Sequence, residues 1–377
     1  MDLTWTPEQE AFRAEARFWL RANVPASPLP SFDTPAGFDA HRDWERRLFE
    51  AGWSAVNWPV AYGGRGVDLV SWLIFEEEYW GSGAPGRVNQ NGVFLLGPTL
   101  LEFGTDAQKA RYLPSIANAD EVWCQGWSEP NAGSDLASLT SRAERRGDTW
   151  VLNGQKTWAS RGAFADRMFG LFRSDPGSER HRGLTYLLVP LDAPGVTVRP
   201  IAQLDGEAGF AEIFLDDVEV PVEDTLGPEG EGWKVAMSTA SFERGVILRS
   251  PGRFMATAER MLALAGDRAG LAPSSVLDDV TDAWMRVEAY RLATHWSVSK
   301  LIEGSEIGAE ASLNKLWWSE MDVDLHRAAM ALQGDEAELA DRWTEGFLFA
   351  LAGPIYAGSN EIQRNIVAER VLGLPRS

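Results

Sequence analysis

The chain has 377 residues, of which 45% are apolar and 24% are charged, a composition typical of globular proteins. At roughly 150 residues per domain, this length predicts two or three domains whose cores can form without disulfides or structural metals. The formal net charge of −20 opposes nucleic-acid phosphates and anionic membranes, which argues against nucleic-acid binding as the main role.

Metal, disulfide and membrane chemistry all lack support in the sequence. Cys124 is the single cysteine, and the four histidines are scattered without metal-ligand spacing. The first residues lack the basic and apolar regions of a signal peptide. The longest mostly apolar stretch, 93–103, is shorter than the roughly 20 residues that span a bilayer. We therefore expect a cytoplasmic protein without membrane insertion.

The first part of the chain has helical periodicity. Thr6, Pro7 and Gln9 form a helix start with capping-box spacing, and apolar residues then recur three and four positions apart. We predict an all-helical domain over residues 1–122. Its further helices are expected at 38–51, 68–80 and 92–103.

The pattern changes near Trp123, where short β-rich runs separated by turn signals such as Asn153-Gly154 replace the helical period. Because no helices alternate with these runs, we predict a central antiparallel β domain over 123–225. The runs lie at 149–152, 168–172, 184–189, 196–198 and 211–215.

Helical periodicity returns after the glycine-containing turn at 228–232 and continues through the last part of the chain. We predict a C-terminal helical domain over 226–377, so that the fold class is α+β in the order helical, β, helical. Its helices are expected at 233–264, 276–301, 307–332, 338–350 and 359–371.

Several widespread catalytic motifs are absent. The sequence has no GxSxG nucleophile elbow and no GxxxxGK[ST] phosphate-binding loop. Gly64-Arg65-Gly66 lacks the third glycine and the preceding strand of a dinucleotide-binding fingerprint. These absences argue against serine hydrolases, P-loop kinases or GTPases, and Rossmann dehydrogenases.

Three polar, glycine-containing stretches interrupt apolar surroundings, and each alone could be a loop closed by side-chain-to-backbone hydrogen bonds. They read Trp123-Cys-Gln-Gly-Trp-Ser-Glu-Pro-Asn-Ala-Gly-Ser-Asp135, Asn153-Gly-Gln-Lys-Thr-Trp-Ala-Ser160 and Ile355-Tyr-Ala-Gly-Ser-Asn-Glu-Ile-Gln-Arg-Asn365. In this order, and together with Phe214-Leu-Asp-Asp-Val-Glu-Val-Pro221, they resemble the acyl-CoA dehydrogenase family over essentially the whole chain.

The resemblance implies an FAD-dependent oxidoreductase of fatty acid or lipid metabolism with a C-terminal four-helix bundle. In this family a carboxylate takes the Cα proton of an acyl-CoA thioester while the Cβ hydrogen moves as hydride to flavin N5, giving a trans-2-enoyl-CoA. Electron-transferring flavoprotein, or an equivalent acceptor, normally reoxidises the flavin. Family members form tetramers.

The resemblance also assigns residues to the flavin. The alternatives are a tight loop capped by serine and asparagine for the first stretch, plain core packing for Trp158, and a simple helix N-cap for Ser359. The cofactor-binding residues implied are Gln125, Trp127, Ser128, Gly133, Ser134, Trp158, Ser160, Ser359 and Glu361.

The catalytic base occupies an unusual position. Most family members place a glutamate directly after the tyrosine of the third stretch, where this chain has Ala357. A second family position, early in a C-domain helix, coincides with Glu243. An apolar neighbourhood of Phe242, Val246 and Ile247 is expected to raise the pKa of Glu243 by desolvation. The alternative is a solvated helix residue or an ion-pair partner of a core arginine.

Substrate contacts follow from the same comparison. In the family the backbone N–H at the position of Ala357 polarises the thioester carbonyl, and Ser134 also reaches the thioester ligand. Arg244 matches an arginine near the base and the CoA end, with a structural ion pair as its alternative. Gln90 lies in a polar cluster that aligns with the end of the acyl pocket and hints at a functionalised or bulky acyl group, with a helix-cap cluster as its alternative.

The sequence departs from the family where subunits usually meet. The stretch 264–273 lacks the expected Arg-x-x-Phe-Gly motif, and Met330-Ala-Leu-Gln-Gly-Asp-Glu336 replaces a Gln-x-x-Gly-Gly loop. Half of the usual adenosine site is therefore missing. This resembles a bacterial subgroup that forms α2β2 assemblies, so we expect either such a heterotetramer or a homotetramer with an altered hold on FAD. Two rival functions stay open: an acyl-CoA oxidase that uses O2, and a non-catalytic partner subunit.

Overall fold

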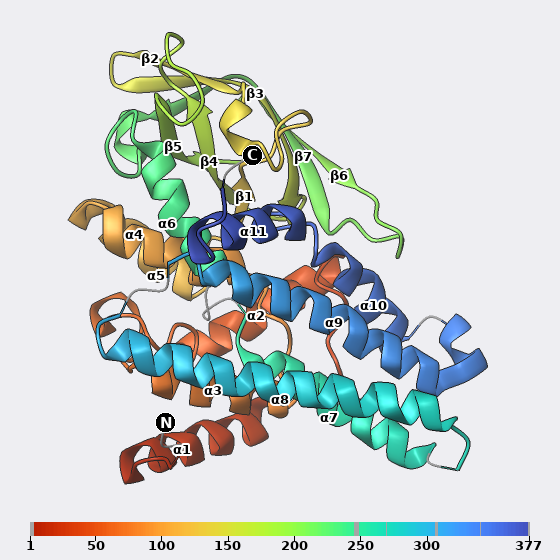
Figure 1. Cartoon of the computed structure of the whole chain (residues 1–377). Helices are drawn as coiled ribbons and strands as arrows, with labels where there is room; N and C mark the ends of the chain where they lie inside the picture. Colours follow the sequence, from red (N-terminus) through yellow and green to blue (C-terminus); the bar gives the residue numbers. More distant parts are fainter. Residues whose placement is uncertain (1–3, 245–248, 269, 306–307, 340, 376–377) are drawn as a thin grey trace. The chain divides into compact units, whose positions relative to one another are not determined.

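The computed structural model describes residues 4–244, 249–268, 270–305, 308–339 and 341–375. Along the chain, helices come first, a seven-stranded sheet follows, and helices return, which confirms the expected fold class (Figure 1). Contacts divide the chain into two compact units that are described separately. The helical unit comprises Met1–Ala26, Val67–Ala84 and Glu243–Ser377, and the sheet unit comprises Ser27–Gly66 and Pro85–Phe242.

The helical unit begins with the predicted capping box. The Thr6 hydroxyl accepts from the Gln9 backbone N–H, and the Gln9 side chain accepts from the Thr6 backbone N–H at 3.0 Å. Figure 1 shows α7, α8 and α9 as long helices running alongside one another. The helices are α1 (Pro7–Asn23), α3 (Leu69–Gly81), α7 (Pro251–Asp267), α8 (Ser274–Ile302), α9 (Ala311–Gln333), α10 (Arg342–Ala352) and α11 (Asn360–Ile366).

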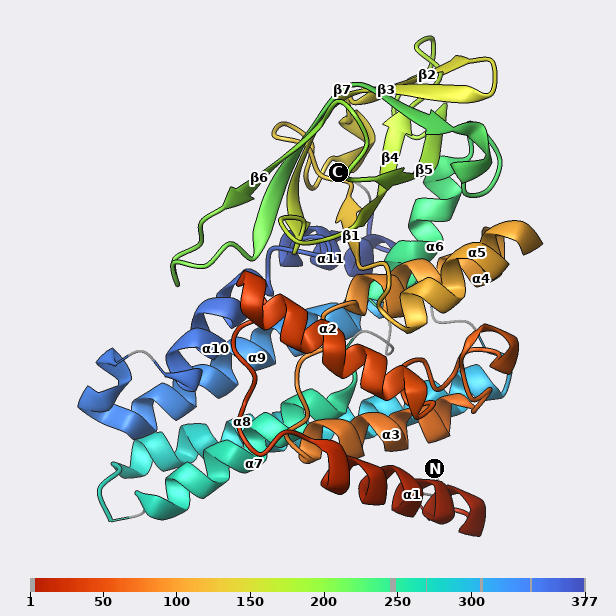
Figure 2. The same ribbon diagram turned by 180° about the vertical axis from the view of Figure 1, so that it is seen from behind.

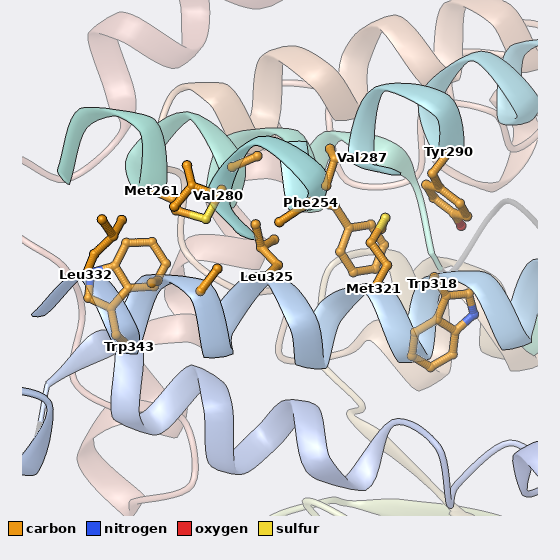
Figure 3. Close-up of a cluster of buried hydrophobic side chains, with 14 residues drawn as sticks. Phe254, Met261, Val280, Val287, Tyr290, Trp318, Met321, Leu325, Leu332 and Trp343 are labelled. Carbon is orange, nitrogen blue, oxygen red and sulfur yellow. The ribbon is translucent and has the colours of Figure 1, made fainter. Parts of the chain in front are cut away.

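The core of this unit lies between α7, α8, α9 and α10 (Figure 3). Phe254 and Met261 from α7 meet Val287 from α8 and Leu325 from α9, and Trp343 of α10 closes one end. Each large apolar side chain buried here contributes about 1.5–3 kcal/mol, so the periodic apolar stripes of these helices account for their packing.

One helix prediction was wrong. Residues 233–264 were expected to form a single helix, but the chain forms α6 (Gly232–Arg244) and a separate α7 that starts at Pro251. Proline lacks an N–H for the helical ladder and suits the first helical turn, so it begins α7 instead of continuing α6. The expected neighbours Val246 and Ile247 lie outside the described residues.

Two further helix ends differ from the expected ones. Asp341 caps α10 by accepting from the backbone N–H groups of Trp343 and Thr344, so α10 begins at Arg342 and not at 338. The last predicted helix, 359–371, is α11 followed by a π-helical turn, Val367–Val371.

The sheet unit is built on one seven-stranded sheet in the order β1-β4-β2-β3-β7-β6, with β5 paired to β4. Figure 2 shows the long β7 beside the edge strand β6. Most pairs are antiparallel as predicted, whereas β1 and β2 each pair with β4 in parallel. The strands are β1 (Trp123–Gly126), β2 (Arg142–Arg146), β3 (Thr149–Ser160), β4 (Arg167–Arg173), β5 (Leu184–Pro190), β6 (Val196–Ile201) and β7 (Phe210–Pro221).

Helices complete the sheet unit. The unit contains α2 (Pro35–Glu50), α4 (Gly97–Phe103) and α5 (Asp106–Ala117). A π-helical turn, Gly92–Leu96, leads directly into α4. Within the part of the chain that the structure describes, no helix combines the length and the apolar character needed to cross a membrane.

Candidate active site

The first two polar stretches lie side by side in the sheet unit. After β1 the chain forms the loop 127–135, and the Thr157 backbone N–H of β3 donates to the Ser128 carbonyl at 2.9 Å. A small bridge between Glu129 and Ala132 closes the loop. The structure therefore brings together the first two stretches that the resemblance assigns to the flavin.

A buried ion pair holds this loop against the sheet. The ammonium group of Lys156, which has no exposed surface, lies 2.8 Å from Glu129 Oε1 and also donates to the Leu171 carbonyl at 2.8 Å. Glu129 accepts in addition from the backbone N–H groups of Thr140 and Ser141. A carboxylate so surrounded fixes the start of the loop relative to β3 and β4.

Burial and mutual attraction together set the pKa values of this pair. Burial by itself would raise the pKa of Glu129, but the Lys156 ammonium and hydrogen bonds from Thr140 and Ser141 outweigh it and lower that pKa to about 2. Burial lowers the pKa of Lys156, against the attraction of Glu129. The sequence analysis missed both residues, although a lysine at a buried position of a β-rich run could have indicated a partner.

Trp158 has an unusual backbone. Its φ is +59°, at a bulge between Lys156 and Ala159 where β3 shifts register against β7. The indole is 59% exposed and meets Phe210 edge-on, with ring centroids 5.8 Å apart. Left-handed backbone is costly for a large residue and is retained where the site needs the side chain in that direction. Plain core packing is therefore not the role of Trp158.

The loop that carries the other predicted flavin residues offers unused hydrogen-bond donors. Trp127 is nearly buried, and its indole N–H has no hydrogen-bond partner in the described chain. Gly133 and Ser134 are exposed, and a Cβ built on Gly133 would meet no atom within 4 Å. A loop that contains both an orphaned donor and an open glycine backbone fits a flat, acceptor-rich ring such as a flavin. Ser128, Gln125 and Ser160 are half-buried.

The third polar stretch forms a braced loop in the helical unit. The Ala357 backbone is left-handed, with φ +58°. Asn360 Oδ1 accepts from Lys315 Nζ at 2.7 Å and from Ser319 Oγ at 3.1 Å, both on α9. Gln363 Nε2 donates back to the Gly358 carbonyl at 3.2 Å. These bonds hold the Ala357 loop against α9.

Glu243 lies in the same unit and is half-buried. Burial raises the pKa of Tyr356, the Arg249 and Arg253 charges oppose the rise, and the Glu243 carboxylate adds to it. The predicted base therefore lies within electrostatic reach of the residue that precedes Ala357. The Arg244 side chain lies outside the described residues.

Ser359 and Glu361 behave as a helix cap. The Ser359 hydroxyl accepts from the Ile362 backbone N–H at 3.5 Å, and Glu361 is exposed in the first turn of α11. The Glu361 backbone N–H and the Ser359 hydroxyl hold the pKa of Glu361 below its usual value. Their contact with FAD stays a prediction.

The polar cluster around Gln90 is mainly structural. Asn89 is fully buried, and its amide donates to the carbonyls of Ile116 and Glu121 and accepts from the Trp123 backbone N–H at 3.0 Å. Asn89 thereby anchors the start of β1, and the helical turn that follows has no side-chain cap, so the cluster is not the helix cap given as the alternative. Gln90 itself is half-buried, and its contact with an acyl group stays a prediction.

Neither a cluster of metal-ligating side chains nor an exposed thiol is found among the described residues. No group of three or more His, Cys, Asp or Glu side chains in them could hold a metal ion. Cys124 is buried in the sheet core, where burial raises the pKa of its thiol to about 12 and keeps it protonated.

The chain thus has an α–β–α fold, with one braced polar loop on the sheet and a second in the helical unit. The chain matches three family models in order: the acyl-CoA dehydrogenase N-terminal domain over 6–120, the middle domain over 124–218 and the C-terminal domain over 230–372. It therefore belongs to the acyl-CoA dehydrogenase family, and it is an enzyme of that kind.

Individual relatives agree. The chain is 42% identical over 384 residues to acyl-CoA dehydrogenase IpdE1 of Mycobacterium tuberculosis, covering 97% of this chain and 98% of that protein. Among solved structures it is similar to the Tcur3481-Tcur3483 steroid ACAD, with a TM-score of 0.88, 29% identity and full coverage of both chains. It is also similar to the ChsE4-ChsE5 complex from Mycobacterium tuberculosis, with a TM-score of 0.83, 30% identity and full coverage.

Proposed function

We propose that this chain catalyses the FAD-dependent α,β-dehydrogenation of an acyl-CoA thioester to a trans-2-enoyl-CoA, with Glu243 as the base. The observation that carries the proposal is that Glu243 is half-buried near the end of α6 and belongs to the same compact unit as Ala357, the alanine that occupies the usual base position. A carboxylate from the α6 end thus supplies the group that Ala357 lacks.

Each residue has a defined task in this reaction. The Glu243 carboxylate takes the proton from the substrate Cα, and the Ala357 backbone N–H polarises the thioester carbonyl, which acidifies that proton. FAD, when bound, supplies the acceptor for the hydride that leaves Cβ. Arg244 and Ser134 are assigned to the thioester and its CoA end, and Gln90 to the acyl group.

The cofactor would be held mainly from the sheet unit. The buried Glu129–Lys156 pair fixes the loop, so that Trp127, Ser128 and Ser134 can present donors to the ring while Trp158 covers one face. The family resemblance assigns Ser359 and Glu361 to FAD as well. The domain boundaries at 1–122, 123–225 and 226–377 belong to this proposal and rest on the changes of periodicity.

The chain is proposed to act within a tetramer, either of identical chains or as an α2β2 assembly with a related subunit. The name of the ChsE4-ChsE5 complex supports the second form, because it describes two different components of a similar protein. The name of the Tcur3481-Tcur3483 steroid ACAD, a similar protein, supports a bulky acyl group in the substrate of this chain. Electron-transferring flavoprotein or an equivalent acceptor would reoxidise the flavin.

The non-catalytic partner subunit stays the second candidate, because Ala357 stands where most relatives have their base. The test is the visible spectrum of the purified chain, flavin stoichiometry after denaturation, and detection of enoyl-CoA product. One FAD per chain with thioester-dependent flavin bleaching supports the enzyme. A flavin-bearing chain that no thioester bleaches, alone or with a co-expressed relative, contradicts it. Fast reoxidation by O2 would indicate an oxidase.

A further inference from the structure

Arg249 is a buried cation next to the proposed reaction centre. The residue is 9% exposed and lies in the connection before α7. Its guanidinium carbon lies 4.7 Å from the centroid of the Trp318 ring and 5.2 Å from that of Tyr356. Its backbone carbonyl accepts from the Tyr290 hydroxyl at 2.7 Å, which fixes the backbone there. The side chain therefore packs beside two neighbouring aromatic rings, whose own centroids lie 5.8 Å apart.

No acceptor among the described residues satisfies this guanidinium. Arg249 Nε is buried and has no hydrogen-bond partner, and the described residues offer the group no ion pair within 4 Å. Arg253, one turn further along, does pair with Asp322, at 2.6 Å. Asp322 feels the Arg249 charge at longer range but is engaged by Arg253 and His326. The ring contacts favour the positive charge but leave Arg249 Nε without an acceptor among the described residues.

Burying a charged group without hydrogen-bond acceptors costs free energy. Such a group is therefore a candidate for binding a ligand that supplies the missing acceptor. The position indicates which ligand. Tyr356 contacts Arg249 and directly precedes Ala357, and it also feels the Glu243 carboxylate. The guanidinium thus lies beside the groups assigned to the thioester and its α-carbon, within the helical unit.

We infer that Arg249 binds an oxygen acceptor carried by the acyl group of the substrate, a carboxylate or a carbonyl oxygen, and so determines substrate specificity. This inference rests on the proposed function, since it places the acyl group beside Ala357. A planar guanidinium presents paired donors that match a carboxylate best and a ketone oxygen less well. A plain alkyl chain would leave those donors unsatisfied at a desolvation cost.

The test compares acyl-CoAs of equal length that differ in one oxygen function. The purified holoprotein is titrated by calorimetry with butyryl-, hexanoyl- and octanoyl-CoA. It is also titrated with the CoA thioesters of equal length that carry either a terminal carboxylate or a keto group on the acyl chain. The wild type is expected to bind the oxygen-bearing member of at least one pair about 10- to 100-fold more tightly. Arg249→Met should abolish that preference, and Arg249→Lys should restore part of it.

Arg291→Met serves as the control, because Arg291 pairs with Glu288 on the same helix and should keep the wild-type preference. Equal affinity for both members of every pair in the wild type overturns the inference without any variant. An undiminished preference in Arg249→Met overturns it as well.

The kinetics of flavin reduction by the same thioesters, measured beside the calorimetric titrations, separate this inference from the proposed function. Flavin reduction by alkyl and oxygen-bearing thioesters alike, with equal kcat/KM in the wild type and Arg249→Met, overturns the inference and leaves the dehydrogenase standing. A binding preference that depends on Arg249, in a protein whose flavin no thioester reduces, supports the inference and overturns the dehydrogenase.

Discussion

At the scale of single residues, the Glu129–Lys156 pair shows how a polar loop can be fixed from within. Both charges are buried, and each has further hydrogen-bond partners in the sheet unit. A buried pair of this kind adds little compared with an apolar pair, yet losing one partner is expensive because the other charge stays buried. The position of the loop 127–135 should therefore depend on both residues together.

Lys156→Met tests this dependence. Removing the ammonium leaves the Glu129 carboxylate buried, and we expect a loss of about 3–5 kcal/mol in the free energy of unfolding together with weaker FAD retention. Arg145→Met, which breaks the exposed pair with Glu229, should cost about 1 kcal/mol or less. Urea unfolding of both variants at pH 7 gives the comparison. Equal small losses would contradict the role given to Lys156.

The same pair predicts the acid stability of the protein. The pKa of Glu129 is lowered from 4.5 to about 2 in the folded state, so its stabilisation is present above pH 4.5 and is lost as pH falls toward 2. Because Lys156 causes much of this lowering, the gap in stability between wild type and Lys156→Met should narrow over that range. A gap that stays constant in unfolding measurements from pH 5 to pH 2 would contradict the assignment.

Trp158 offers a residue-scale test that separates cofactor binding from folding. Its ring is largely exposed, so Trp158→Ala should change the free energy of unfolding of the apoprotein by about 0.5 kcal/mol or less. FAD retention, measured by fluorescence during dialysis, should fall clearly because the ring is expected to cover the flavin. Leu204→Ala, at another exposed apolar position of the same unit, should alter neither quantity. Unchanged FAD retention in Trp158→Ala would remove Trp158 from the cofactor site.

At the scale of elements, the sequence predicted those helix ends that depend on residues close together in the chain. The capping box at Thr6 and the N-cap at Ser359 were predictable because each cap depends on residues three positions apart. The break before Pro251 was missed because apolar periodicity continues across it. The parallel pairing of β1 with β4 could not be predicted, since alternation gives the faces of a strand and not its partner.

In the candidate site, too, the short motifs were predicted from the sequence and the long-range contacts were not. Family motifs identified the stretches that carry Ser128, Trp158 and Ala357, and the first two stretches meet in the structure. The braces behind them, Lys156 with Glu129 and Lys315 with Asn360, were missed. Such pairs join residues far apart in the sequence, and a lone lysine in a sequence is normally interpreted as a solvated surface residue.

Asn360→Ala tests the brace between α9 and the Ala357 loop. The change removes the acceptor that Lys315 and Ser319 share, and we expect a loss of about 1–3 kcal/mol in the free energy of unfolding. Turnover should fall as well, since the Ala357 N–H loses its fixed position. Asn365→Ala, an exposed position on α11, is the matched control for both measurements. Wild-type stability and turnover in Asn360→Ala would contradict the brace.

At the scale of the whole molecule, the helical unit carries more exposed apolar surface than an isolated protein needs. Trp284, Met285, Leu292 and Trp296 of α8 are all at least 38% exposed, as is Trp317 of α9. A pocket between these helices is lined in part by Met285 and Trp317. Exposed apolar side chains gathered on two packed helices are typical of subunit interfaces, which supports the proposed assembly.

Trp296→Glu tests that assembly. A charge placed in a buried interface is costly, so we expect the complex to dissociate into smaller species in sedimentation velocity runs. Phe18→Glu, at an exposed position of α1, should leave the assembly unchanged. A wild type that sediments as a monomer at micromolar concentration, alone and with a co-expressed related subunit, would contradict the assembly.

The central claim is that Glu243 removes the substrate Cα proton, and Glu243→Gln tests it most directly. The amide keeps the size of the side chain and removes its basicity, so FAD content should equal that of the wild type. Anaerobic flavin reduction by a reactive acyl-CoA should slow by about 10²–10⁴-fold, whereas Glu259→Gln, on an exposed turn of α7, should reduce flavin at the wild-type rate. Flavin reduction at the wild-type rate in Glu243→Gln would show that another group is the base.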